Sequence, residues 1–300
     1  MEYRSFGDLS RTITANLHKI PDDVDLVAGI PRSGLLAGNL IASFLNLPVT
    51  DLDGFFCNRS DSKHVLVVDD TVYGGKSMAY ARKLIREAFM GQRITFCTVY
   101  AHPRSVNLVD ICFETLTSPG CQEWNIMHRN KLNDFCMDID GVLCRNPEKA
   151  EDDDGPAYRH FLNTARPLML PSHRVGYLVT GRLEKYRKET EVWLSRHHIL
   201  YDELCMLDLP DAKTRWKLNA SAKYKAEVYK SHPQSLLFIE SEQKEAGEIA
   251  RMSGKRVLCF YNQKIYIPPT ASLIRHRARR FQSGMVRKAG KMALNLKSLI

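Results

Sequence analysis

Long apolar runs, paired cysteines and a leader-like N-terminus are all missing from this sequence of 300 residues. No stretch of about 18 or more uncharged apolar residues occurs, so we expect no membrane-spanning segment. The first residues, Met1 to Ser5, lack the apolar core of a signal peptide. The eight cysteines are scattered singly without a Cys-x-x-Cys pair, which favours buried thiols over disulfides or zinc. We therefore expect a cytoplasmic protein.

Acidic residues are missing from one part of the chain. Residues 271–300 hold eight Lys and Arg but no Asp or Glu, so they carry eight of the nine net positive charges. Apolar residues recur there at three- and four-residue spacing, from Ile274 to Leu299, which predicts an amphipathic helix with a basic polar face. Such a helix suits an anionic membrane surface, here the inner face of the cytoplasmic membrane. Docking on the protein's own core is an alternative; nucleic acid is not expected as a partner, because no nucleic-acid motif accompanies the charge.

The rest of the chain alternates short apolar strands with helical patterns, which is typical of α/β folds. We expect two doubly wound parallel-sheet (Rossmann-like) domains and the basic C-terminal amphipathic helix, over residues 1–130, 131–268 and 269–300. The first helix is expected over residues 8–20, with Asp8 or Ser10 as its N-cap.

One stretch of the first domain places acids, glycines and a hydroxyl directly after a strand. Val65 to Val68 predicts a buried parallel strand, and Asp69 and Asp70 follow at the edge where open α/β sheets bind ligands. Gly74 and Gly75 then allow backbone N–H groups to point at a phosphate at the start of the next helix. These acids are placed to hold sugar hydroxyls, directly or through a divalent cation. The alternative is a solvated acidic turn.

This order of residues resembles the loop of type I phosphoribosyltransferases that binds 5-phosphoribosyl 1-pyrophosphate (PRPP). The resemblance implies that Asp69 and Asp70 hold the ribose hydroxyls and that Arg32, Ser33 and Gly34, after an earlier strand, grip the pyrophosphate. The 5-phosphate would be bound by the backbone of the following loop and by its last hydroxyl, residues Thr71, Val72, Tyr73, Gly74, Gly75, Lys76 and Ser77. The family usually has Thr where this chain has Gly74.

Two further features of the first domain concern the acceptor. The span Asp51 to Lys63, where the resembled family has a long closing loop, is short, and a short lid argues against a small buried nucleobase. Residues 106–114 and 118–125 occupy the place of the family's acceptor-binding hood. Within them, Trp124 either stacks on a flat acceptor or sugar or belongs to the core, and the sequence leaves both open.

The second domain begins with another apolar strand that ends in acids, Phe135 to Leu143. Asp138 and Asp140 project to the same side of an extended chain and a glycine follows them. One carboxylate can attack phosphorus while Mg²⁺ screens its charge, and the other can protonate the leaving oxygen and then activate water.

This pattern resembles the first motif of haloacid dehalogenase-like (HAD) phosphohydrolases, and the later motifs follow in order. The resemblance implies a nucleophile at Asp138, a general acid/base at Asp140 and a phosphoryl-binding hydroxyl at Thr180. Further residues implied are the charge-offsetting Lys225, with Lys223 as the alternative, the substrate-binding Arg182, and a Mg²⁺ site of Asp138, Asp140, Glu240 and Glu242. The family usually has Asp at the fourth motif, and which Glu ligates stays open. About forty residues separate Asp140 from Thr180, room for a small flap but not a large cap.

Two such sites on one chain favour a shared intermediate. We expect a bifunctional enzyme that transfers 5-phosphoribosyl from PRPP to an acceptor and then removes the 5-phosphate. The short lid, the uncapped phosphatase and the basic tail together favour a large acceptor at the membrane face, such as a lipid-linked glycan of polysaccharide biosynthesis that gains a ribofuranose. The alternatives are a nucleobase phosphoribosyltransferase with a nucleotide 5'-phosphatase, and a regulator that senses PRPP without catalysis.

Overall fold

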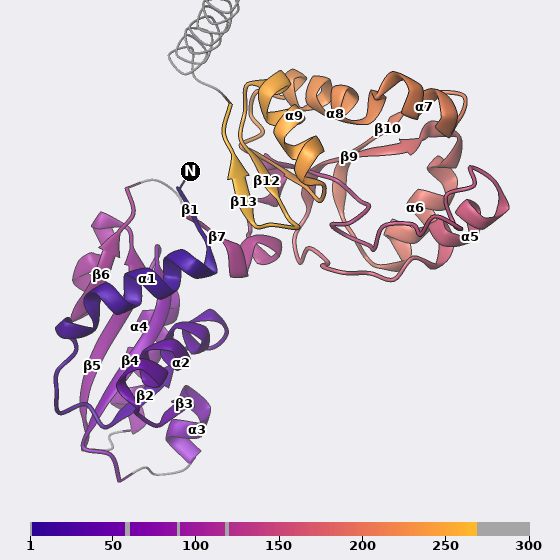
Figure 1. Ribbon diagram of the computed structural model, residues 1–300. Coiled ribbons are helices and arrows are strands. Elements are labelled where there is room, and N and C mark those ends of the chain that lie inside the picture. Colours follow the sequence, from indigo (N-terminus) through magenta and orange to yellow (C-terminus); the bar gives the residue numbers. More distant parts are fainter. Residues whose placement is uncertain (1, 58–60, 89–90, 118–119, 269–300) are drawn as a thin grey trace, which may run out of the picture. The chain divides into compact units, whose positions relative to one another are not determined.

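The computed structural model describes residues 2–57, 61–88, 91–117 and 120–268 (Figure 1). The chain divides into two compact units, Met1–His128 and Arg129–Ile300, close to the expected boundary after residue 130. The predicted basic helix, its membrane contact and parts of the predicted lid and hood (residues 58–60, 118 and 119) lie outside the described residues. None of the helices in the described ranges is both long and apolar enough to cross a membrane.

Unit 1 is built on a parallel sheet of five strands in the order β3-β2-β4-β5-β6. These strands are β2 (Leu26–Gly29), β3 (Val49–Asp51), β4 (His64–Val72), β5 (Arg93–Ala101) and β6 (Ile111–Thr115). A separate parallel pair joins β1 (Glu2–Arg4) to β7 (Gly120–Gln122). The four helices described in this unit are α1 (Phe6–Asn16), α2 (Ser33–Leu45), α3 (Leu52–Cys57) and α4 (Lys76–Ala88), with 3₁₀ turns η1 (Leu17–Lys19), η2 (Pro103–Leu108) and η3 (Glu123–His128).

The strand β4 is buried on both faces because helices cover both sides of its sheet. Leu66 and Val68 face the core that α1 and α2 complete, whereas Val65 and Val67 face the core that α3 and α4 complete. This explains why the strand is a continuous apolar run rather than an alternating one. The first residues of the short span after β3 form α3, whose Leu52 and Phe55 are buried in the second of these cores.

The first helix begins earlier than predicted, because its N-cap is Ser5. The Ser5 hydroxyl accepts a hydrogen bond from the Asp8 backbone N–H, and the Asp8 carboxylate accepts one from the Ser5 backbone N–H. This reciprocal capping box makes Asp8 the third helical residue, so the prediction of Asp8 or Ser10 as the cap was wrong.

Unit 2 contains a sheet of six strands in the order β10-β9-β8-β11-β12-β13, parallel except for the last strand. The strands are β8 (Phe135–Met137), β9 (Val175–Leu183), β10 (Tyr201–Leu207), β11 (Leu237–Glu240), β12 (Val257–Cys259) and β13 (Lys264–Tyr266). The described helices are α5 (Pro156–Thr164), α6 (Arg187–Arg196), α7 (Ala212–Leu218), α8 (Ala220–Ser231) and α9 (Gln243–Ser253), with 3₁₀ turns η4 (Leu132–Asp134) and η5 (Glu184–Tyr186).

The helices of unit 2 also lie on both sides of the sheet, with α8 and α9 on one side and α5 and α6 on the other (Figure 1). Cys136, Val179 and Phe238 of the central strands pack with apolar residues of α8 and α9 in one core. The predicted class, α/β with doubly wound parallel sheets, is therefore confirmed for both described units.

Candidate functional site

The predicted pyrophosphate loop and acidic pair of unit 1 lie side by side at the carboxyl ends of β2 and β4. Asp69 and Asp70 lie in the C-terminal half of β4, and both are buried. A Cβ on Gly34, at the start of α2, would lie 2.6 Å from the Val68 carbonyl oxygen and 3.1 Å from the Asp69 Cα. Only glycine permits this close approach, so it brings the Arg32–Gly34 turn against the carboxylates.

Asp70 is held by donors from a distant segment, the turn η3. The Trp124 indole Nε1–H donates to Asp70 Oδ2 over 2.7 Å, and Asn125 Nδ2 donates to the same oxygen over 3.3 Å. Asn125 Nδ2 also donates to the Ser33 hydroxyl oxygen over 2.9 Å, so its amide joins the pyrophosphate loop to the acidic pair. Asn125 was not predicted, because nothing in its local sequence shows a contact across more than fifty residues.

Trp124 is partly buried, and it both packs on the core and contacts the site. Its ring centroid lies 5.7 Å from that of Phe6 and 6.5 Å from that of Tyr100. Neither predicted role included its hydrogen bond to Asp70. The indole therefore orients a carboxylate that is expected to bind ribose.

Asp69 has an unusual charge state for a carboxyl group. Burial, followed by the adjacent negative charge of Asp70, raises the pKa of Asp69 to about 8. The two carboxyl groups therefore share one proton near neutral pH. The proton leaves when a cation or a hydrogen-bond donor stabilises the second negative charge. A ligand with hydroxyl donors, or a cation, supplies that stabilisation.

The predicted 5-phosphate loop leads directly into the first turn of α4. Thr71 and Val72 end β4, Tyr73 to Gly75 form the turn, and α4 begins at Lys76. Gly75 has φ of +70°, and a Cβ there would lie 2.3 Å from Leu108 Cδ1, so the turn requires glycine. A Cβ on Gly74 would meet nothing within 4 Å, so there is room at this position for the threonine that the resembled family usually has. The helix start offers free backbone N–H groups to an anion.

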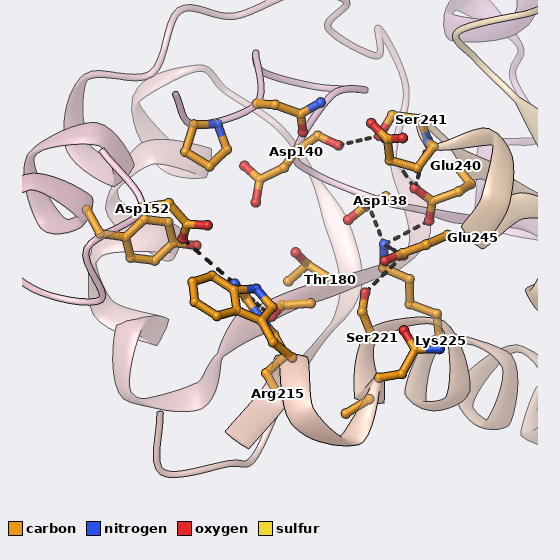
Figure 2. A pocket seen from close by; sticks show the side chains of 18 residues that line it. Asp138, Asp140, Asp152, Thr180, Arg215, Ser221, Lys225, Glu240, Ser241 and Glu245 are labelled. Carbon is orange, nitrogen blue, oxygen red and sulfur yellow. Dashed lines mark hydrogen bonds and ion pairs between the residues drawn. The ribbon is translucent and has the colours of Figure 1, made fainter. Parts of the chain in front are cut away.

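The second site is a cavity of about 300 Å³ in unit 2, at the carboxyl ends of β8, β9 and β11 (Figure 2). Six predicted residues from four separate stretches of sequence line this cavity, namely Asp138, Asp140, Thr180, Lys225, Glu240 and Glu242. The other lining residues include Glu245, Ser241, Asp152, Arg215 and Trp216, none of which was predicted.

Lys225 is the centre of a buried ionic cluster. Its Nζ lies 2.7 Å from Asp138 Oδ2, 2.8 Å from Glu240 Oε2 and 2.8 Å from Glu245 Oε2 (Figure 2). Burial lowers the pKa of this lysine, but the charges of the three carboxylates outweigh burial and raise it well above its ordinary value. Lys223, the alternative third-motif lysine, is exposed on the same helix and donates to the Leu218 carbonyl oxygen.

The carboxylates of the cluster differ in their protonation. Burial raises the pKa of Asp138 well above its ordinary range, and the charges of Glu240 and Asp140 add to this, against the opposing effect of Lys225. Glu245 has a lowered pKa, because the charge and N–H donors of Lys225 outweigh its burial. The excess negative charge of the cluster therefore favours a proton on Asp138, the predicted nucleophile, whereas Glu245 stays ionised.

Asp140 is paired with Arg182, which is itself buried. Arg182 Nη2 donates to Asp140 Oδ1 over 2.7 Å, and Arg182 Nε donates to Oδ2 over 3.0 Å. Burial alone would raise the pKa of Asp140, but the charge and donors of Arg182 outweigh it and lower the pKa. Arg182 therefore lies behind Asp140 and outside the residues that line the cavity, a position suited to orienting Asp140 rather than touching substrate.

The loops after β8 and β11 contact each other at the turn that follows Asp140. Gly141 has φ of +75°, and a Cβ there would lie 2.4 Å from the Ser241 hydroxyl oxygen. Because this glycine leaves room, the Ser241 hydroxyl can donate to the Asp140 carbonyl oxygen over 3.1 Å. The loop after β11 thereby fixes the loop after β8.

The charge of the cavity bears on whether it suits a divalent cation. Two cationic side chains, Arg215 and Lys225, are among the residues that line it. Six carboxylates line it too: Asp138, Asp140, Asp152, Glu240, Glu242 and Glu245. This donor set of hard oxygens with excess negative charge fits Mg²⁺ chemically. As placed, no three or more His, Cys, Asp or Glu side chains in the described ranges are arranged to hold a metal. In this cavity, Lys225 Nζ lies among three of the carboxylates.

The sequence matches no protein-family model and no curated protein. Among solved structures, about two fifths of the chain is similar to phosphoribosyltransferases. A purine phosphoribosyltransferase from Pyrococcus horikoshii Ot3 is 17% identical with a TM-score of 0.35, over 41% of this chain and 92% of that one. The xanthine-guanine-hypoxanthine phosphoribosyltransferase of Helicobacter pylori is 14% identical with a TM-score of 0.37, over 43% and 97%. An orotate phosphoribosyltransferase from Aeropyrum pernix is 18% identical with a TM-score of 0.29, over 37% and 70%.

Proposed function

We propose that unit 1 transfers a 5-phosphoribosyl group from PRPP to an acceptor and that unit 2 then removes the 5-phosphate. The observation that carries this proposal is the convergence of separately predicted residues in each unit. In unit 1, the Arg32–Gly34 turn lies against Asp69 and Asp70 beside the first turn of α4. In unit 2, Asp138, Thr180, Lys225 and Glu240 line one cavity.

In the transfer step, a new bond forms between the acceptor oxygen and ribose C1 while the bond from C1 to pyrophosphate breaks, and the proton of the acceptor hydroxyl passes to the departing pyrophosphate. Asp69 and Asp70 hold the ribose hydroxyls, and Trp124 and Asn125 keep Asp70 in the required orientation. The backbone from Thr71 to Ser77 binds the 5-phosphate at the start of α4. Bound Mg²⁺ would neutralise charge on the pyrophosphate.

In the hydrolysis step, an Asp138 oxygen attacks phosphorus and the ester bond to the ribose oxygen breaks. Thr180 binds the transferred group, and Lys225 offsets the negative charge beside it. Asp140 would give a proton to the leaving oxygen and later take one from the water that releases phosphate. Because Arg182 lowers the pKa of Asp140, both transfers require the Arg182 pair to loosen as substrate enters. Mg²⁺ held by Asp138, Asp140 and either Glu240 or Glu242 would screen the phosphoryl charge.

For the acceptor we propose a glycan, lipid-linked at the inner face of the cytoplasmic membrane. The span after β3 supports a large acceptor, since its described part folds into α3 with Leu52 and Phe55 buried in the core instead of forming a lid. A nucleobase acceptor is the alternative. The membrane contact would be made by residues 271–300.

The test is incubation of the protein with PRPP, Mg²⁺ and a panel of glycan and nucleobase acceptors, followed by mass spectrometry. We expect wild-type protein to yield the ribosylated glycan without phosphate, and Asp138→Asn to yield the same product with its 5-phosphate retained. A dephosphorylated product from Asp138→Asn would refute the coupling. Formation of nucleosides instead would establish the alternative, and no pyrophosphate release with any acceptor would support a PRPP sensor.

A further inference from the structure

One side of the cavity in unit 2 has no part in the proposed chemistry. The helix α7 contributes Arg215 and Trp216 there, and the loop before α5 contributes Asp152. Figure 2 shows Arg215 and Asp152 on one side of Thr180, with Lys225, Glu240 and Glu245 on the other side. The phosphoryl group is expected at Thr180 and Asp138. A leaving group that extends from this position toward α7 would meet Asp152, Arg215 and Trp216.

Arg215 is fixed beside the phosphoryl position by a backbone contact. Its Nη1 donates to the Gly181 carbonyl oxygen over 2.9 Å, next to Thr180 in the chain. Its Nη2 lies 3.7 Å from Asp152 Oδ1, beyond hydrogen-bond distance. A guanidinium carries five N–H donors, so further donors remain for an oxygen-rich ligand.

Trp216 adds an apolar surface to a cavity that is otherwise mostly polar. The residue is 58% exposed although it lines the cavity, and the Arg215 guanidinium lies 5.7 Å from its ring centroid. Exposed indole rings at polar cavities offer a flat face to a ligand with one apolar side. The amides of Asn146 and Asn219 line the same cavity.

An aromatic face, a carboxylate, a guanidinium and amides together suit a sugar ring. The C–H bonds on one face of a sugar pack on an aromatic ring, while its hydroxyls donate to carboxylates and accept from N–H groups. We propose that Asp152, Arg215 and Trp216 form a subsite for the sugar ring of the phosphate monoester that unit 2 hydrolyses. The substrate class is thus a furanoside or free sugar 5-phosphate rather than a phosphopeptide. This inference rests on the phosphatase half of the proposed function.

Binding to the Asp138→Asn variant tests the subsite without turnover. Isothermal titration calorimetry would compare inorganic phosphate, ribose 5-phosphate and a phosphoserine peptide, each with Mg²⁺. We expect ribose 5-phosphate to bind about tenfold more tightly than inorganic phosphate, and Trp216→Ala, added to Asp138→Asn, to remove most of that difference. Tyr261→Ala, at an aromatic residue 85% exposed and outside the cavity lining, is the matched control and should preserve it.

Turnover by otherwise wild-type protein provides the second measurement. Acetyl phosphate has no ring in its leaving group, so we expect Trp216→Ala to lower the ratio of kcat/KM for ribose 5-phosphate over acetyl phosphate about tenfold, mainly through KM. Arg215→Gln should lower the same ratio, and Arg215→Lys should restore part of it. Equal affinity for phosphate and ribose 5-phosphate, or tighter binding of the phosphopeptide, would overturn the subsite. If wild-type protein hydrolysed neither substrate, the phosphatase function would be refuted. The binding measurements would still show whether the sugar subsite exists.

Discussion

Replacement of Lys225 by methionine probes the ionic cluster of unit 2 most directly. The change keeps much of the side-chain length but removes the ammonium group that contacts Asp138, Glu240 and Glu245 at 2.7 to 2.8 Å. These groups are screened little by solvent, since Lys225 and Glu240 are almost completely buried. Removal of one member of a buried ion pair leaves the partners uncompensated and costs about 3 to 5 kcal/mol.

We therefore expect Lys225→Met to lower the melting temperature of unit 2 by roughly 10 °C or more. Calorimetry on the full chain measures this as the shift between wild type and variant. Millimolar Mg²⁺ should recover part of the loss, since a divalent cation neutralises the same carboxylates. Lys223→Met, on the exposed side of the same helix, is the control and should change stability by less than about 0.5 kcal/mol. Equal effects of the two substitutions would show that Lys225 does not stabilise unit 2 by neutralising these carboxylates.

Two further predictions concern unit 1. Because the folded pKa of Asp69 is about 8 and its ordinary value is 3.8, the folded state binds more protons between these values, and wild-type stability should fall as pH rises through this window. Asp69→Asn lacks this titration. In urea unfolding, the free energy of unfolding of the variant should therefore rise relative to wild type by up to a few kcal/mol between about pH 4 and pH 8. Parallel pH profiles of the two proteins would contradict this. Trp124→Phe keeps a ring but loses the N–H donor to Asp70, so we expect PRPP to bind roughly tenfold more weakly by calorimetry, and an unchanged Kd would argue against orientation of Asp70 by the indole.

The sequence was most informative where a chemical pattern and a buried strand coincide. Val65 to Val68 were predicted as a strand of a parallel sheet, and β4 includes them together with the two acids. The second-domain residues Asp138, Thr180 and Lys225 follow the same logic, because Asp138 directly follows a buried strand, Thr180 lies in the C-terminal half of one and Lys225 lies on a buried helix face. Parallel strands bring such ends together whatever the loops between them do.

Contacts that depend on helix faces and long sequence separations could not be predicted. Glu245 reaches Lys225 from the first turn of α9, but its surroundings, Gln243 to Glu248, look like an ordinary solvated helix surface. Arg215 and Trp216 were missed for the same reason, since both belong to a short polar helix. The Trp124 contact with Asp70 joins residues 54 positions apart, and the chain between them shows no sign of it.

Because the Trp124 indole donates a hydrogen bond to Asp70, its intrinsic fluorescence can report ligand binding in unit 1. The chain has three tryptophans, and the other two, Trp193 and Trp216, belong to unit 2. Indole emission responds to a charge beside the ring nitrogen, so a ligand that engages Asp70 alters the light emitted by Trp124. With phenylalanine at positions 193 and 216, intrinsic fluorescence would follow occupancy of the first site alone, without a label.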